Sequence, residues 1–128
     1  MDAPSVAVSW GELIDKITIL EIKDERLAAE AARRNVKKEL SLLNRSATKT
    51  LNMIEIRGLK DELSRINTQL WDIEDQIRAK EAQQQFDQEF IELARSVYKT
   101  NDVRTAIKRR INEVLSSELM EEKSYAVY

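Results

Sequence analysis

The sequence predicts an all-α domain, and three observations support this class. Two glycines and one proline leave few residues that interrupt a helix. The most frequent residues are Ala, Leu, Glu, Lys, Arg and Gln, which lose least on entering a helix. Apolar residues recur three and four apart, as on a helix that packs along another helix, at Ile56, Leu59, Leu63, Ile66, Leu70, Ile73 and Ile77. We expect a long antiparallel, coiled-coil-like helical hairpin, with two shorter C-terminal helices packed on it and short extended termini.

The N-terminal half predicts one long helix after an extended segment over residues 1–9. Val6 and Val8 alternate with small residues there, as in an extended chain. Ser9 and Glu12 have the spacing of a capping box, which predicts a helix over residues 10–43. A break near residues 28–30 is left open. Residues 44–50 are rich in turn formers and are expected to form the hairpin turn.

The C-terminal half predicts three more helices within the same single domain of residues 1–128. A helix over 51–84 contains the apolar repeat, and Gly58 inside it is interpreted as the mark of a close helix crossing. Asp87 is the expected N-cap of a helix over 87–99. The apolar phase then slips at residues 100–102, so a separate helix is expected over 101–117. The tail over 121–128 alternates again and is hypothesised to pair with residues 6–8.

The chain contains no histidine and no cysteine, which excludes most enzyme classes. The usual zinc sites, Glu-x-x-His di-iron sites and His-dependent nucleophiles lack their residues. We therefore predict no catalytic residue, no metal ligand and no cofactor. A net charge of −2 does not favour nucleic acid, and no apolar run is long enough for a membrane span. The first residues lack a secretion signal, so we expect a cytoplasmic location.

Acidic pairs spaced i,i+3 keep one catalytic alternative open, because carboxylates on a helix face can hold Mg²⁺. The pairs are Glu21/Asp24, Asp72/Asp75, Glu89/Glu92 and Glu118/Glu121. The all-helical nucleotide pyrophosphohydrolases use Glu-x-x-Glu followed by Glu-x-x-Asp, but here the Glu-x-x-Asp comes first. Solvent-exposed helix faces are therefore the favoured interpretation of these pairs.

Two polar clusters are more unusual than the other charged faces. The first lies among isoleucines in the first helix, and the second follows one face of the last predicted helix at steps of three and four. Asn beside Arg and Lys on one face is suited to bind a carboxylate or phosphate. With the C-terminal tail, these clusters form our candidate site for a ligand or partner: Asp15, Lys16, Glu21, Lys23, Tyr98, Asn101, Asp102, Arg104, Lys108, Asn112, Glu122, Lys123 and Tyr125. Two basic stripes, residues 33–38 and 104–110, are interpreted mainly as solvated faces.

Four segments in this order resemble an uncharacterised bacterial family of small proteins, DUF6165. They are LIDKITILEIK (13–23), LWDIED (70–75), LARSVYKTND (93–102) and EEKSY (121–125). The resemblance implies no activity, but because its motifs coincide with the polar clusters, it implies that the clusters share a site. Relatives carry an Asp-Pro-type break at the place of Ala29–Glu30, which leaves the continuity of the first helix open.

The favoured function is a non-enzymatic helical binding or scaffold protein that self-associates or binds a protein partner through the polar faces. The alternative is a small enzyme or sensor that binds an anionic metabolite, such as a nucleotide or nucleotide sugar, with or without Mg²⁺. Lys16, Arg104 and Lys108 would hold that metabolite.

Overall fold

The computed structural model describes residues 1–124, and these residues form four helices and no strand. The helices are α1 (Trp10–Arg26), α2 (Glu30–Leu51), α3 (Ile54–Ala82) and α4 (Gln88–Val114). The predicted all-α class is confirmed. The hypothesis that the tail pairs with residues 6–8 depends on residues 125–128, which lie outside the described part of the chain.

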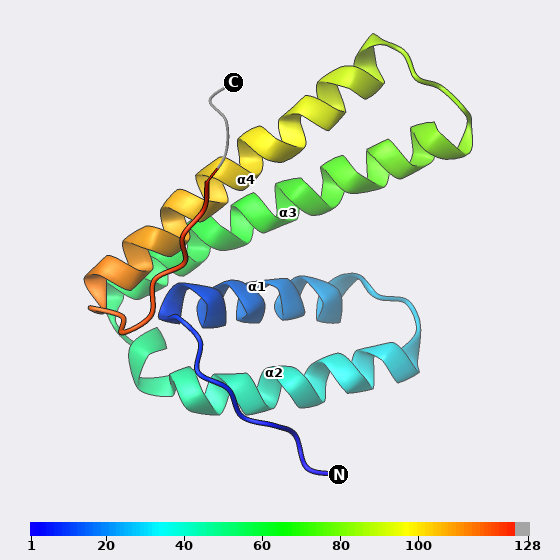
Figure 1. The fold of residues 1–128 in the computed structure, drawn as a ribbon. Helices are drawn as coiled ribbons and strands as arrows, with labels where there is room; N and C mark the ends of the chain where they lie inside the picture. The colour runs from blue at the N-terminus through cyan, green and yellow to red at the C-terminus, as the bar shows by residue number, and fades with distance from the viewer. Residues whose placement is uncertain (125–128) are drawn as a thin grey trace.

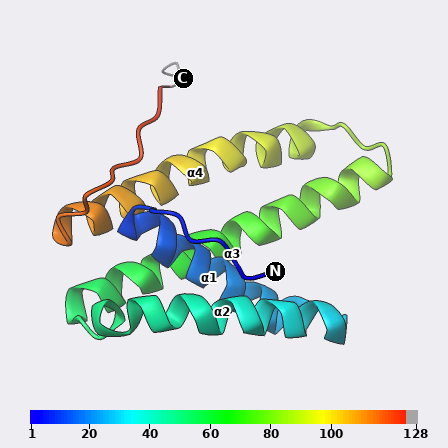
Figure 2. The same cartoon turned by 60° about the horizontal axis from the view of Figure 1, so that its bottom comes forward.

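The helices form two antiparallel hairpins, α1–α2 and α3–α4 (Figure 1). α1 contacts α3 from Asp15 near its start to Arg26 at its end, which pairs with Asp72 of α3 at 2.5 Å. The start of α1 also packs against α4, so that α1 lies between α2 and the second hairpin. Away from this contact the hairpins diverge towards their turns, at residues 27–29 and 83–87, as both views show (Figures 1 and 2). Among the described residues, the N-terminal half of α1 contacts both α3 and α4.

The hydrophobic core lies at this meeting point. Ile14 of α1, Ile56 and Leu63 of α3, and Ile111 of α4 are completely buried and form one cluster. Burying a side chain of this size contributes about 1.5–3 kcal/mol. Along the predicted apolar repeat, Leu70 is also buried, whereas the remaining members are partly buried. The repeat on α3 therefore faces the interior, as the sequence predicts.

The first long helix of the prediction is wrong in its extent. Residues 27–29 leave the helical conformation, with Ala29 at φ −71° and ψ 122°, so that residues 10–43 form the whole of α1 and the first part of α2. The local sequence favours helix here, but folding back allows α2 to bury Val36 and Ala47. The break that the family resemblance left open is present.

The predicted hairpin turn at residues 44–50 is also wrong, because α2 continues through it to Leu51. Ala47 is fully buried in this stretch. The Thr48 hydroxyl donates to the carbonyl of Asn44 at 2.8 Å, which satisfies a polar group inside the helix. The turn instead lies at Asn52–Met53, and the following helix starts at Ile54 rather than at residue 51.

The predicted break at residues 100–101 does not occur, since α4 runs without interruption from Gln88 to Val114. The apolar phase slips because polar residues occupy the buried face: Lys108 and Asn112 are buried there. The predicted N-caps at Ser9 and Asp87 are confirmed. Ser9 accepts from the backbone N–H of Glu12 at 3.1 Å, and Asp87 accepts from that of Phe90 at 3.0 Å. The cap expected at Thr100 or Asn101 for a separate helix over 101–117 is wrong, because both residues lie inside α4.

Candidate functional site

The polar cluster lies where the first turns of α1 cross α4. The backbone N–H of Gly11 donates to Asn112 Oδ1 at 2.7 Å. A Cβ at Gly11 would lie 2.5 Å from the carbonyl oxygen of Lys108. The two backbones therefore approach more closely than a side chain at position 11 allows, and glycine is required there by packing.

Asp15 is the centre of the cluster and is only 1% exposed. Its Oδ1 accepts from Asn67 Nδ2 and Arg104 Nε, both at 2.9 Å, and its Oδ2 accepts from Arg104 Nη2. This two-point pairing with the guanidinium is the strong geometry for Arg and a carboxylate. The hydrogen bond from Arg104 to Asp15 raises the pKa of Arg104, although partial burial opposes the change.

Thr18 joins Asp15 to α3. Its hydroxyl donates to the carbonyl oxygen of Asp15 at 2.7 Å and accepts from Asn67 Nδ2 at 2.8 Å. Asn67 thus donates to two residues of α1 from a buried position on α3. The cluster therefore connects three helices through polar contacts, directly beside the hydrophobic core.

Lys108 forms the second part of the cluster. Its Nζ lies 2.8 Å from Glu12 Oε2, 2.8 Å from Glu121 Oε2 and 3.9 Å from Asp15 Oδ2. Burial alone would lower the pKa of Lys108, but the hydrogen bonds to Glu12 and Glu121 outweigh it, and the pKa is raised. The hydrogen bond from Lys108 lowers the pKa of Glu121.

The charges in this cluster are satisfied by one another. Arg104 and Lys108 supply two positive charges, while Glu12, Asp15 and Glu121 supply three negative charges. Glu121 adds the third after α4, where the chain turns at Ser116 with a φ of 48° and brings residue 121 back to Lys108. This arrangement is suited to hold helices together.

Five of the predicted site residues come together in or beside the cluster. Asp15, Arg104, Lys108 and Asn112 make the contacts described above. Asn101 lies at its edge, where its Oδ1 accepts from Arg104 Nη1 at 3.5 Å. The two polar clusters predicted from the sequence therefore contact each other through Asp15, Arg104 and Lys108.

The other predicted site residues lie outside the buried contacts. Lys16 is exposed and lies 3.7 Å from Glu39 of α2, and Glu21 lies 2.9 Å from Lys60 of α3. Lys23 lies in the last turn of α1, and Tyr98 and Asp102 are on the exposed surface of α4. Glu122 lies 3.6 Å from Arg109, and Lys123 lies 3.9 Å from Glu121. Tyr125 is outside the described residues.

The family profile of DUF6165, a family of unknown function, matches residues 4–128. The chain belongs to the DUF6165 family. The resemblance stated from four sequence segments is thereby confirmed. No curated protein and no solved structure matches the chain significantly.

Sequence reasoning missed four members of the cluster in this DUF6165 chain. Glu12 was interpreted only as part of a capping box, and Thr18 was one of several polar residues between isoleucines. Asn67 had a signal that was overlooked: it lies four residues after Leu63 and three before Leu70, on the same buried face. Glu121 follows α4 in an irregular segment, so no periodicity links it to Lys108.

The described residues of this DUF6165 member offer neither a cluster of metal-binding groups nor a helix that could span a membrane. Within residues 1–124, no group of three or more acidic side chains is placed to hold a metal ion. No helix in the same range combines the length and apolar character needed to cross a bilayer.

Proposed function

We propose that this DUF6165 protein is a helical binding or scaffold protein that associates with copies of itself. The observation that supports this proposal is the pairing within the polar cluster. Arg104 and Lys108, the cations best suited to hold an anionic ligand, already have the carboxylates of Asp15, Glu12 and Glu121 as partners. The cluster thus acts as a clasp that fixes α1 against α3 and α4, and the outer helix faces remain for binding.

Exposed apolar side chains on the outer faces support a role in association. Ile54 is 87% exposed, and Phe86, Ile91, Val103 and Leu42 also expose much of their surface. Single exposed apolar residues are normal on any protein. They indicate an association surface only where they lie together with charged residues that a partner surface can match. One such group is at the start of α3, where Ile54 lies beside carboxylates.

The proposal is tested by the mass of the purified protein as a function of concentration. Sedimentation velocity or light scattering should give a mass that rises above 14.9 kDa as the concentration increases. A mass that stays at the monomer value over the whole accessible range, at low ionic strength, contradicts self-association.

The second candidate is the binding of an anionic metabolite, which one observation favours. Glu121 comes from the irregular segment after α4, and the Arg104 side chain remains 26% exposed. An incoming phosphate or carboxylate could therefore take the place of Glu121 on Lys108, beside the carboxylate of Glu12. Lys16 would take no part, since it lies beside Glu39.

Thermal-shift measurements with nucleotides, sugar phosphates and Mg²⁺ separate the two candidates. Under the scaffold proposal, none of these compounds raises the melting temperature. A stabilisation that appears in the native protein, increases in Glu121→Gln and disappears in Lys108→Met would favour the metabolite instead.

A further inference from the structure

Gly58 is a glycine in a helix whose role is not explained by the described residues. It lies in the second turn of α3, and a Cβ added there would meet nothing within 4 Å. The predicted close crossing within the chain is therefore absent, in contrast to Gly11. A glycine inside a helix costs about 1 kcal/mol relative to alanine, so this position lowers stability without a visible gain.

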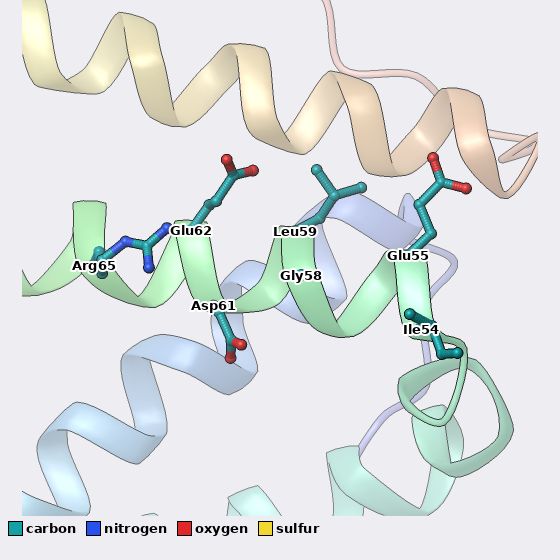
Figure 3. A pocket seen from close by; sticks show the side chains of 7 residues that line it. All are labelled: Ile54, Glu55, Gly58, Leu59, Asp61, Glu62 and Arg65. Carbon is teal, nitrogen blue, oxygen red and sulfur yellow. The ribbon is translucent and has the colours of Figure 1, made fainter.

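Gly58 lies in a shallow, widely open groove whose lining residues all belong to α3. Ile54 lies at one end of the groove, and the carboxylates of Glu55, Asp61 and Glu62 line its rim (Figure 3). In this view Glu55 and Glu62 point to the side of α4, and Asp61 points to the opposite side. The groove thus combines an open backbone, an exposed isoleucine and a rim of negative charge.

The carboxylates of the rim differ in their partners. Glu55 lies 3.3 Å from Arg110 of α4, an exposed ion pair that contributes little to stability. Arg65 adds one positive charge at the far end of the groove. Because Arg110 balances Glu55, the carboxylates of Asp61 and Glu62 against Arg65 leave the groove with a net charge of about −1.

The outer face of α2 has the opposite charge. Residues 30–51 contain six cations and two carboxylates, a net charge of +4 in a chain whose formal net charge is −2. Arg33 and Lys37 each lie 3.8 Å from Asp24 of α1, on the inner side of the helix. The cations exposed along the outer face are Lys38, Arg45 and Lys49, and Leu42 among them is 43% exposed. This basic face therefore matches the groove in both charge and apolar content.

We infer that the groove at Gly58 receives the basic face of α2 from a second copy of the chain, and that the two helices cross at Gly58. A residue without a side chain allows helix backbones to approach closely. The cations of α2 would lie against Asp61 and Glu62, and Leu42 against Ile54. This inference rests on the self-association proposed above and names its surfaces. Because the two surfaces differ, the contact is head-to-tail and leads to a ring or an open chain.

Substitutions at Gly58 test this inference. A side chain at this position should favour the helix of the isolated chain, but it should weaken self-association if two helices cross there. Gly58→Ala should leave the melting temperature of the monomer unchanged or raise it, because alanine favours a helix more than glycine does and a Cβ meets nothing here. The bulkier Gly58→Leu should weaken self-association at least about tenfold, because its side chain occupies the crossing point. Gln76→Leu is the matched control, an exposed position on α3 beyond the groove, and should associate as the native chain does.

Mixing two variants tests the head-to-tail pairing itself. Gly58→Leu loses the groove, and the double variant Lys38→Glu/Arg45→Glu loses the basic face. Each alone should be monomeric in sedimentation velocity, with native circular dichroism. Mixed in equal amounts, they should form 1:1 dimers and nothing larger, because one intact groove meets one intact basic face.

The outcomes distinguish this inference from the proposed function. If the native chain self-associates but Gly58→Leu associates equally well, or the mixture stays monomeric, the inference is overturned and the scaffold proposal stands. If the native chain is monomeric at all concentrations, both are overturned.

Discussion

At the scale of single residues, the main feature is a charge that is buried and fully partnered. Asp15 has almost no contact with solvent and accepts hydrogen bonds from Arg104 and Asn67. A buried ion pair contributes little net stability when compared with apolar residues of the same size. Removing one member is costly because the other charge is then left without a partner.

We therefore predict that Asp15→Ala lowers the free energy of unfolding by about 3–5 kcal/mol, measured by urea denaturation. Lys16→Ala, the adjacent exposed residue paired with Glu39, should change it by less than about 1 kcal/mol. The double variant Asp15→Ala/Arg104→Met should recover part of the loss, since no charge is left unpaired. Equal losses in the free energy of unfolding for Asp15→Ala and Lys16→Ala would contradict the claim that the polar cluster holds α1 against α3 and α4.

Glu121 makes stability depend on pH in a defined direction. Its pKa in the folded protein is lowered from 4.5 by the hydrogen bond from Lys108. The carboxylate therefore stabilises the fold above the pKa of the unfolded chain, and this contribution is lost as the pH falls through the lowered pKa.

We expect Glu121→Gln to reduce the free energy of unfolding at pH 7, and the difference from the native protein to vanish at strongly acidic pH. Chemical denaturation at a series of pH values measures this difference. Glu118→Gln, an exposed neighbour, is the control and should show no such pH-dependent difference. A difference that persists unchanged to low pH would rule out the contact with Lys108.

At the scale of elements, the α1–α2 break gives the sharpest contrast between sequence and structure. Glu30 is the first residue of α2, where proline is well tolerated, and Ala29 before it already has an extended conformation. In a continuous helix over residues 10–43, the same position would be interior.

We predict that Glu30→Pro leaves the free energy of unfolding unchanged or raises it by up to about 1 kcal/mol. A continuous helix would instead lose about 3 kcal/mol or more. Thermal and urea denaturation of Glu30→Pro beside Asn35→Pro, an exposed interior position of α2, would decide the matter. Equal and large losses in both variants would show that the break is wrongly placed.

The elements show why part of the fold could be predicted and part could not. Local signals predicted the N-caps at Ser9 and Asp87 and the apolar face of α3. The break at 27–29 has no Gly or Pro, and the continuity of α4 is hidden by buried Lys108 and Asn112. Both depend on which helices pack together. Periodicity placed Asp15, Arg104 and Lys108 on polar faces, but only their packing shows that these faces meet each other.

At the scale of the whole molecule, two hairpins pack against each other through α1. Their contact contains the hydrophobic core and the polar cluster side by side. At the other end of α1, the partly exposed pair of Arg26 with Asp72 also links the hairpins, but exposed pairs contribute little to stability. We therefore expect the angle between the hairpins to depend mainly on the polar cluster around Asp15. The proposed self-association needs such a fixed geometry, because the faces proposed for it on α2 and α3 belong to different hairpins.

The distance between the two hairpin turns tests this account most directly. The chain has no cysteine, so a spin label attaches only where a cysteine is introduced. The variant Ala28→Cys/Gln85→Cys carries one label in each hairpin turn. Pulsed electron paramagnetic resonance of labelled protein, diluted with unlabelled protein, gives the distribution of distances between the two labels. We predict one narrow distribution in the native background and a clearly broader one after Asp15→Ala/Arg104→Ala. An equally narrow, unshifted distribution in that variant would contradict the claim that the polar cluster holds the hairpins together.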